Sequence, residues 1–380
     1  MGKLIRSRWL VLVLFIVASV LVTTLWIGCN EKQETAGSPV SYQSPVVLSK
    51  ENAAVQSVMA VQGRYTADLM KDKNVVGTAT GFTDDGRLAV LVLTKAPVGV
   101  FAKGTKSISA LPTSLEGVPV VVYVTGDIKP MKGGGVSHTA KQTPPIQLGT
   151  SGGWKYDLAN GYCCSGTLGS LIHLGTTQYV LSNYHVFWGD IVAGGNGRVA
   201  TAGDPVIQPG MVDINCNAAN AQAVANLSGK GSLPSANVDA GYAQAITGMV
   251  STNGAILEVG TISASTTTAF LRQAVKKSGR TTGLSRSTVS GLNGTISVQY
   301  ENECAGGVAF TKTFTGQILI TNRGNAFLNS GDSGSLMVED VTTNPRAVGL
   351  LYAGGGGIAV ANPINDVLSW IGGGAGMVGK

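Results

Sequence analysis

The chain is short of charge, of aromatic rings and of histidine. Among its 380 residues, 13% are charged, 6% are Phe, Trp or Tyr, and 3 are His. A nucleic-acid-binding surface gathers Lys and Arg into a patch and combines them with rings that stack on bases. Here the Lys and Arg residues behind the net charge of +6 are scattered along the chain. We therefore expect no nucleic-acid partner.

Sequence motifs for metal and phosphate binding are also missing. No Cys-x-x-Cys pair and no Cys/His spacing typical of zinc occurs in the chain. The glycine run Gly354–Gly357 lacks the Gly-Lys-Ser/Thr of a phosphate-binding loop. Neither heptads nor a repeat of solenoid length is present. We expect no metal site and no cofactor.

Glycine and β-branched residues are abundant. The 53 glycines and the frequent Val and Thr suit short strands and tight turns, and 44% hydrophobic residues can form a sizeable core. Apolar residues at helical spacing predict one helix over about Glu51–Lys71. Strands are expected at Val75–Phe82, Arg87–Leu93, Val118–Val124, Gly166–Leu174, Tyr179–Ser182, Ile256–Ser263 and Val348–Tyr352. The chain is therefore expected to be mainly β.

The first 29 residues predict export. Basic residues precede the uncharged run Trp9–Gly28, as in a signal peptide, and the run is also long enough to span a bilayer. It ends at Cys29, and the box before this cysteine resembles a bacterial lipoprotein cleavage site, although Trp26 fits that box poorly. A lipid on Cys29 and a retained transmembrane anchor stay open as alternatives. Both place the body of the protein in the cell envelope, attached to the membrane.

Four further cysteines predict disulfides. Cys163, Cys164, Cys216 and Cys304 lie in a chain that is expected to be exported, where disulfides persist. Adjacent cysteines rarely bond to each other because the geometry is strained. We expect Cys163 and Cys164 each to pair with one of Cys216 and Cys304, and which pairs with which stays open.

Composition divides the chain into five parts. These are residues 1–29, the signal peptide or anchor; 30–45, a polar linker; 46–128, a small α+β domain; 129–152, a linker rich in Gly and Pro; and 153–380, a β-rich domain. The small domain carries no catalytic constellation. A pro-domain, an inhibitory module and a partner-binding module all stay open as its role.

Three segments of the last part carry the candidate chemistry. They are Tyr179–Val186, which ends in Leu-Ser-Asn-Tyr-His-Val; Asn237–Ala243, with Val-Asp-Ala; and Asn329–Leu336, with Gly-Asp-Ser-Gly. In these segments, and in the order His, Asp, Ser, the chain resembles the chymotrypsin-like (trypsin-fold) serine peptidases. It is most similar to a bacterial trypsin-like subgroup with Leu-Ser-Asn-x-His-Val and Lys-Ser-Gly-Arg-Thr-Thr-Gly segments, the latter here at Lys277–Gly283. The resemblance covers roughly residues 146–370.

The resemblance implies a chymotrypsin-like double β-barrel with a catalytic triad. Ser333 would be the nucleophile, His185 the general base and Asp239 the carboxylate that orients the base. A Ser hydroxyl is a weak nucleophile at neutral pH and needs such a base, and His can take and return a proton there. A buried carboxylate fixes the imidazole tautomer. The backbone N–H groups of Gly331 and Ser333 are the implied oxyanion hole.

Other residues compete for the same roles. His138 lies in Gly-rich text and His173 inside a strand, where a structural role is expected. Asp204 and Asp213 lie in turn-rich text and are expected to be turn residues. Arg280 is expected to be a structural residue of a turn.

Departures from the family bear on specificity and activation. Phe327 stands where the resemblance places the acidic residue that selects Lys or Arg, so that specificity is not expected. Gly349–Gly354 resembles the strand that pairs with bound peptide. The substrate-binding residues implied in this way are Phe327, Leu351, Tyr352, Ala353 and Gly354, with a modest apolar pocket. No free N-terminus is evident to pair with Asp332, which leaves the route of activation open.

We therefore expect an exported, membrane-tethered serine endopeptidase that acts on proteins or peptides. A non-catalytic binding module on the same fold is the main alternative, because a fold alone does not guarantee activity. An esterase is a weaker alternative. It usually has a Gly-x-Ser-x-Gly elbow in an α/β fold, whereas Ser335 follows Gly334 without the final Gly and the chain is rich in β signals.

Overall fold

The computed structural model describes residues 47–98, 111–130, 138–159, 162–189, 198–229, 231–300 and 309–380. Within Val47–Lys380 they form one compact unit. Cys29 and Cys304, the predicted signal or anchor segment and the linker 30–45 lie outside the described residues. In the described part of the chain, no helix is long and apolar enough to cross a membrane.

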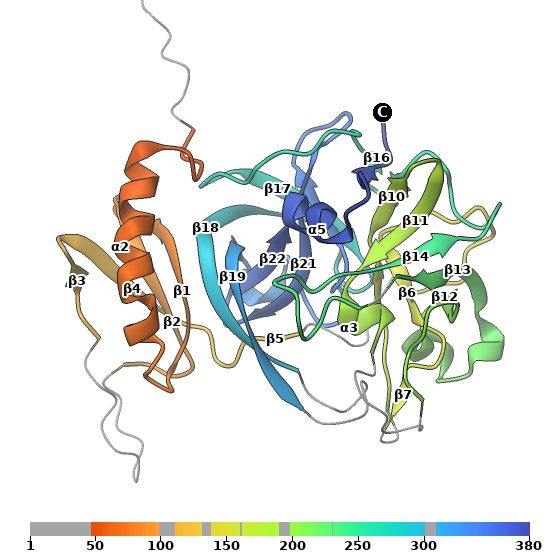
Figure 1. Ribbon diagram of the computed structural model, residues 1–380, viewed down its shortest axis with the longest axis horizontal. Helices are drawn as coiled ribbons and strands as arrows, with labels where there is room; N and C mark the ends of the chain where they lie inside the picture. The colour runs from red at the N-terminus through yellow and green to blue at the C-terminus, as the bar shows by residue number, and fades with distance from the viewer. Residues whose placement is uncertain are drawn as a thin grey trace, which may run out of the picture. The chain divides into compact units, whose positions relative to one another are not determined.

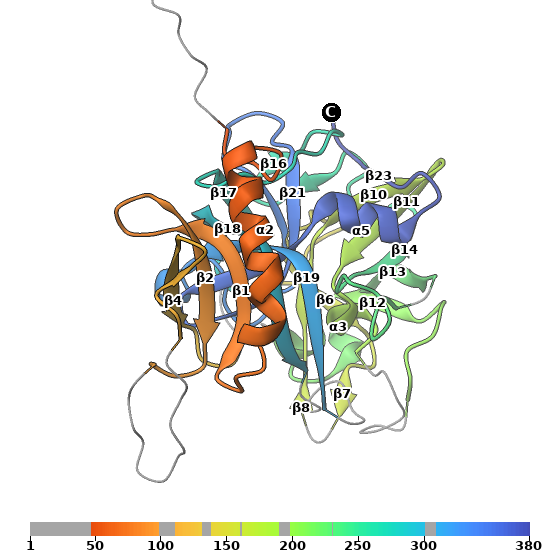
Figure 2. The ribbon, with the colours of Figure 1, turned by 60° about the vertical axis from the view of Figure 1, so that its left-hand side comes forward.

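The first described elements form a helix on a small sheet (Figure 2). Helix α2 (Ala53–Leu69) begins where the Asn52 side chain accepts hydrogen bonds from two backbone N–H groups, a good N-cap. This confirms the predicted helix. Its buried face, which includes Val55, Val58 and Val61, is directed to the core. The sheet consists of β1 (Val75–Phe82), β2 (Leu88–Thr94), β3 (Ser114–Leu115) and β4 (Val118–Val124).

This small sheet continues into a barrel. Strand β1 pairs antiparallel with β2 on one side and with β18 (Gly283–Tyr300) on the other, with Gly77 opposite Ile296. The other strands of this barrel are β17 (Ala274–Gly279), β19 (Phe310–Thr321), β20 (Leu336–Glu339), β21 (Ala347–Gly355) and β22 (Ile358–Pro363). Their order is β17-β20-β21-β22-β19-β18, and β18 pairs with β17 again, which closes the ring.

A second ring is built from the middle of the chain (Figure 1). Its strands are β6 (Thr150–Trp154), β9 (Gly166–Leu168), β10 (Ser170–Leu174), β11 (Thr177–Ser182), β12 (Pro205–Gln208), β13 (Gln222–Ser228), β14 (Gly241–Ala245) and β23 (Gly376–Met377). Their order is β23-β10-β11-β14-β13-β12-β6-β9. Strands β10 and β9 lie near opposite ends of this order, yet Gly169 alone separates them in the chain. The sheet therefore also closes on itself.

Short elements complete the fold. They are β5 (Lys129–Pro130), β7 (Leu158–Ala159), β8 (Tyr162–Cys163), β15 (Ala255–Ile256), β16 (Gly260–Thr261), helices α3 (Tyr184–Phe187) and α5 (Ile364–Ile371), and 3₁₀ turns at Met211–Ile214, Ala218–Asn220 and Arg323–Asn325. Buried apolar residues of both rings, such as Trp154 and Tyr352, belong to one core cluster. The mainly β, chymotrypsin-like double β-barrel predicted from the sequence is confirmed.

One predicted strand is wrong. The segment Ile256–Ser263 forms a tight turn between β15 and β16 rather than a continuous strand. Glu258 and Gly260 have φ values of +62° and +87°, and this left-handed backbone reverses the chain. Glycine explains the second value. Glu258 is a residue type that rarely adopts a positive φ, so the pattern of apolar residues gives no sign of this turn.

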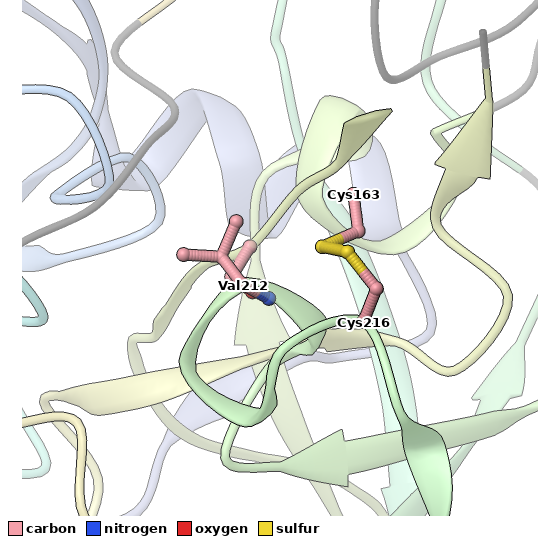
Figure 3. The surroundings of a disulfide bond; sticks show 4 residues. Cys163, Val212 and Cys216 are labelled. Atoms are coloured by element: carbon pink, nitrogen blue, oxygen red, sulfur yellow. A yellow bond between two sulfur atoms is a disulfide. The ribbon is translucent and has the colours of Figure 1, made fainter. Parts of the chain in front are cut away.

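A disulfide joins Cys163 at the end of β8 to Cys216, and Figure 3 shows it beside Val212. The two Cα atoms are 5.6 Å apart and 53 positions separate them in the chain. This confirms the prediction that Cys163 pairs with one of Cys216 and Cys304, and the partner is Cys216. Cys164 is disulfide-bonded as well. Disulfides persist in oxidising compartments, which fits an exported protein.

Candidate active site

The end of β11 presents His185. The strand finishes at Ser182, and Asn183 then leads into the single turn of α3, which carries His185 as its second residue. The Asn183 side chain donates a hydrogen bond of 2.8 Å to the carbonyl oxygen of Asp239. The two segments that the sequence singled out for His and Asp therefore lie together.

His185 and Asp239 form a buried pair. His185 Nδ1 lies 2.6 Å from Asp239 Oδ2, and the His185 backbone N–H donates to Oδ1 at 3.3 Å. Asp239 is fully buried, and these donors replace hydrogen bonds that its carboxylate would make to water. With Nδ1–H facing the carboxylate, Nε2 is left as the proton acceptor. Nε2 is buried and has no hydrogen-bond partner among the described residues.

Ser333 lies on the loop before β20. Its Oγ donates to the carbonyl oxygen of Tyr352 at 3.2 Å, and its own carbonyl accepts from Thr167 N–H at 2.8 Å. A Cβ added at Gly166 would lie 2.4 Å from a Val186 methyl and 2.9 Å from the Ser333 carbonyl oxygen. The backbone of Ser333 and the residue after His185 thus approach each other across Gly166.

Glycine allows this loop to turn sharply. Gly331 has φ +96° and Gly334 has φ +92°, values that L side chains rarely adopt. A Cβ at Gly334 would also lie 2.2 Å from Ser182 Oγ, so the end of β11 leaves no room for a side chain there. The loop therefore holds Ser333 and the backbone N–H groups around it in one conformation.

A buried ammonium holds the same loop, and the sequence did not assign it. Lys277 Nζ lies 3.0 Å from Asp332 Oδ1, and both side chains are fully buried. Asp332 also accepts from the backbone N–H groups of Thr281 and Thr282, at 2.9 and 3.1 Å. Burial lowers the pKa of Lys277, while the neighbouring Asp332 acts in the opposite direction. The segment Lys277–Gly283 was noted for its resemblance, but only folding shows that its lysine reaches Asp332.

Arg280 is structural, as expected, but it does more than stabilise a turn. It is fully buried, and its guanidinium donates to both carboxylate oxygens of Asp213 at 2.5 and 2.6 Å. Such a two-point contact fixes both groups. Asp213 also accepts from Ser151 Oγ at 2.5 Å. Asp204 accepts instead from Trp154 Nε1 at 3.0 Å.

The other two histidines have their own surroundings. His138 is buried, and its Nε2 lies 2.7 Å from Glu258 Oε2. His173 lies in β10, opposite Gln178. Only His185, of the three, has a ring nitrogen hydrogen-bonded to a fully buried aspartate.

Tyr300 is a second residue that the sequence did not reveal. Its hydroxyl donates to Asp239 Oδ2 at 2.7 Å, so this oxygen accepts from both His185 and Tyr300. The ring stacks on Phe310 with centroids 4.8 Å apart and an interplanar angle of 8°. Burial, and after it the charge of Asp239, raises the pKa of Tyr300 well above its ordinary value. Tyr300 therefore stays a neutral donor. No motif in the sequence around Tyr300 predicts its contact with Asp239.

The residues expected to bind substrate are found on and beneath β21. Phe327 is only 2% exposed and packs in a core cluster with Leu328 and Leu351. Its side chain therefore belongs to the barrel core. Ala353 and Gly354 pair through their backbone with Pro130 and Lys129 of β5. In the described part of the chain, no group of three His, Cys, Asp or Glu side chains is arranged to hold a metal ion.

Comparisons with known proteins give structural similarity alone. No protein-family model and no curated protein matches the chain. Among solved structures, a glutamic-acid-specific serine protease is 18% identical with a TM-score of 0.40, covering 61% of this chain and 100% of its own. Protease A of Thermobifida fusca is 20% identical, also with a TM-score of 0.40, and covers 62% and 99%. Cellulomonas bogoriensis chymotrypsin is 18% identical with a TM-score of 0.37, covering 62% and 99%. Similarity at this level transfers no function to the chain.

The Lys277→Met variant tests the buried ion pair. It removes the ammonium and leaves the Asp332 carboxylate buried without it, which costs about 3 to 5 kcal/mol when one partner of such a pair is lost. Urea unfolding followed by fluorescence should show this loss. Lys276→Met is the matched control, because among the described residues the Lys276 ammonium donates to a backbone carbonyl, that of Val341, and pairs with no carboxylate. Equal losses in both variants would contradict the assignment.

The Tyr300→Phe variant tests the second donor to Asp239. Phe keeps the stacking on Phe310 but leaves Oδ2 to His185 alone, so one of the contacts that fix the carboxylate is lost. We expect the rate at which Ser333 reacts with a fluorophosphonate to fall about 2- to 10-fold.

Tyr242→Phe serves as its control, because this half-buried ring packs on Tyr179 in the other barrel. It should leave the reaction rate unchanged. A Tyr300→Phe protein that is less stable but reacts at the wild-type rate would show that Tyr300 is a packing residue only.

Proposed function

We propose that the chain is a serine endopeptidase in which Ser333, His185 and Asp239 form the catalytic triad. The observation that carries this proposal is the buried His185–Asp239 pair, which leaves Nε2 without a partner among the described residues. His138 Nδ1 and His173 Nδ1 are also buried without a partner among the described residues, so the feature that sets His185 apart is the fully buried aspartate on its other ring nitrogen. An acceptor held in this way suits a group that takes a proton during reaction.

The proposed reaction begins with a rotation of Ser333. Its Oγ leaves the Tyr352 carbonyl, turns to His185 Nε2, and attacks the carbonyl carbon of the scissile peptide while its proton passes to Nε2. The Asp239 carboxylate balances the imidazolium that forms, and Tyr300 holds this carboxylate in place. The backbone N–H groups of Gly331 and Ser333 are the proposed donors to the oxyanion. The imidazolium then gives the proton to the leaving amine, and water repeats the sequence on the acyl-enzyme.

The proposed substrate is an extended protein or peptide segment. A strand edge recognises such a segment by main-chain hydrogen bonds, and β21 is the strand whose Tyr352 carbonyl accepts from Ser333 Oγ. No acidic residue lies at position 327 to select Lys or Arg, since Phe327 is in the core there.

Export and membrane attachment are part of the proposal. The disulfide between Cys163 and Cys216 suits an oxidising compartment. Attachment through residues 1–29 rests on their sequence, with a lipid on Cys29 and a transmembrane anchor as the two forms. A non-catalytic binding module is the competing function. It would use the same strand edge but would need no buried aspartate oriented on His185.

A fluorophosphonate probe tests the proposal, because it reacts only with a serine activated by a base. The whole chain should be labelled at Ser333, as peptide mass spectrometry would show. Ser333→Ala and His185→Ala should each abolish labelling. Ser287→Ala, on β18, and His173→Ala, on β10, are the matched controls and should be labelled like the wild type. Folded protein without labelling at Ser333 would favour the binding module.

A further inference from the structure

A short strand from the N-terminal part of the chain lies on the edge that is proposed to bind substrate. Strand β5 pairs antiparallel with β21, with Pro130 opposite Ala353 and Lys129 opposite Gly354. The carbonyl oxygen of Ile128, just before β5, accepts a hydrogen bond from Gln299 N–H of β18 at 3.3 Å. Ile128 is almost fully buried. This backbone therefore lies between β21 and the end of β18.

The pairing uses the part of β21 nearest to the reacting serine. Ala353 directly follows Tyr352, whose carbonyl oxygen lies 3.2 Å from Ser333 Oγ. A peptide bound for cleavage would need the same main-chain groups of β21, because one strand edge accepts one partner at a time. Lys129 and Pro130 therefore occupy the edge that a substrate segment would use.

The turn after β21 is shaped to receive the same backbone. A Cβ at Gly355 would lie 2.9 Å from the carbonyl oxygen of Asp127, and a Cβ at Gly356 only 2.0 Å from the Cα of Thr125. A Cβ at Gly357, in contrast, would meet nothing within 4 Å. The glycine run Gly354–Gly357 thus includes two positions where only glycine leaves room for residues 125–127.

Two contacts hold the first residues of the segment 125–130. Thr125 N–H donates to the carbonyl oxygen of Thr94, at the end of β2, at 2.7 Å. Lys95 Nζ lies 3.0 Å from Asp127 Oδ1, in a half-exposed ion pair. The small sheet that contains β2 is itself joined to the barrel, because its strand β1 pairs with β18. The segment is therefore held next to the barrel. Such tethering gives a high effective concentration at β21.

We propose that β21 and the Gly355–Gly356 turn bind residues 125–130 of the same chain in the place of a peptide substrate. In the intact chain the edge of β21 is then closed to peptides, while the His185–Asp239 pair is already assembled. The inference deepens the proposed peptidase function and rests on it. A peptide must displace this segment, or the segment must be removed, before β21 can bind substrate.

Two probes separate this inference from the proposed function. A fluorophosphonate with a short alkyl group needs the activated serine and no strand pairing. A tetrapeptide with a C-terminal diphenyl phosphonate needs the edge of β21 as well. The ratio of the two rates of reaction with Ser333 reports how open β21 is, whatever the reactivity of the serine.

Gly356→Ala is the test variant and Gly357→Ala its matched control. Both residues have positive φ, +53° and +92°, so both substitutions cost backbone strain. Only the methyl at position 356 collides with Thr125. In the whole chain we expect Gly356→Ala to raise the ratio of peptide to alkyl probe rates about tenfold, as for a lost interaction of about 1.4 kcal/mol. Gly357→Ala should leave the ratio at the wild-type value.

The outcomes distinguish the two claims. If the alkyl probe labels Ser333 and the ratio rises in Gly356→Ala alone, the self-binding of residues 125–130 is supported. If the alkyl probe labels Ser333 but the ratio is the same in all three proteins, or rises equally in both variants, the self-binding is overturned. Failure of the alkyl probe to label any of the three folded proteins overturns the peptidase function, and the self-binding with it.

Discussion

The buried carboxylate of Asp239 is the interaction on which the rest of the site depends. A fully buried charge without a nearby cation is costly, so it must be compensated by hydrogen-bond donors. Here the donors are His185 Nδ1, His185 N–H and the Tyr300 hydroxyl. They come from α3 and from the far end of β18, so each barrel supplies part of the compensation. The same contacts fix the direction of the imidazole and leave Nε2 on the opposite side.

Close approach of backbones is the second constraint. Gly166 separates Val186 from the Ser333 carbonyl, Gly334 fits against Ser182, and Gly356 fits against Thr125. At each of these positions a Cβ would lie within 2.4 Å of another residue. The abundance of glycine, which the composition linked to turns, is at these positions a requirement for bringing distant segments together. The candidate active site and the segment that covers β21 thus both depend on glycines that let two backbones approach closely.

Elements that depend on a short stretch of sequence were predicted correctly. Val75–Phe82 and Val118–Val124 are strands with the expected bounds, because short runs rich in β-branched residues between turn signals favour strands. The His185 and Asp239 segments, chosen for their motifs, are in contact. Tyr300 and Lys277 were missed as partners because their contacts join residues far apart in the chain, 61 positions apart for Tyr300 and Asp239. Pairing of β5 with β21 likewise has no local signal, since it depends on how the small sheet attaches to β18.

The most direct test of the central claim is the rate at which Ser333 reacts with a fluorophosphonate in the Asp239→Asn variant. The amide keeps the shape of the side chain but removes its charge and can present an N–H to His185, which favours the tautomer with the proton on Nε2. If Asp239 orients His185 as the account holds, the rate should fall about 10⁴-fold while the protein stays folded. A folded Asp239→Asn protein that reacts as fast as the wild type would contradict the account, because Ser333 would then be activated without this pair.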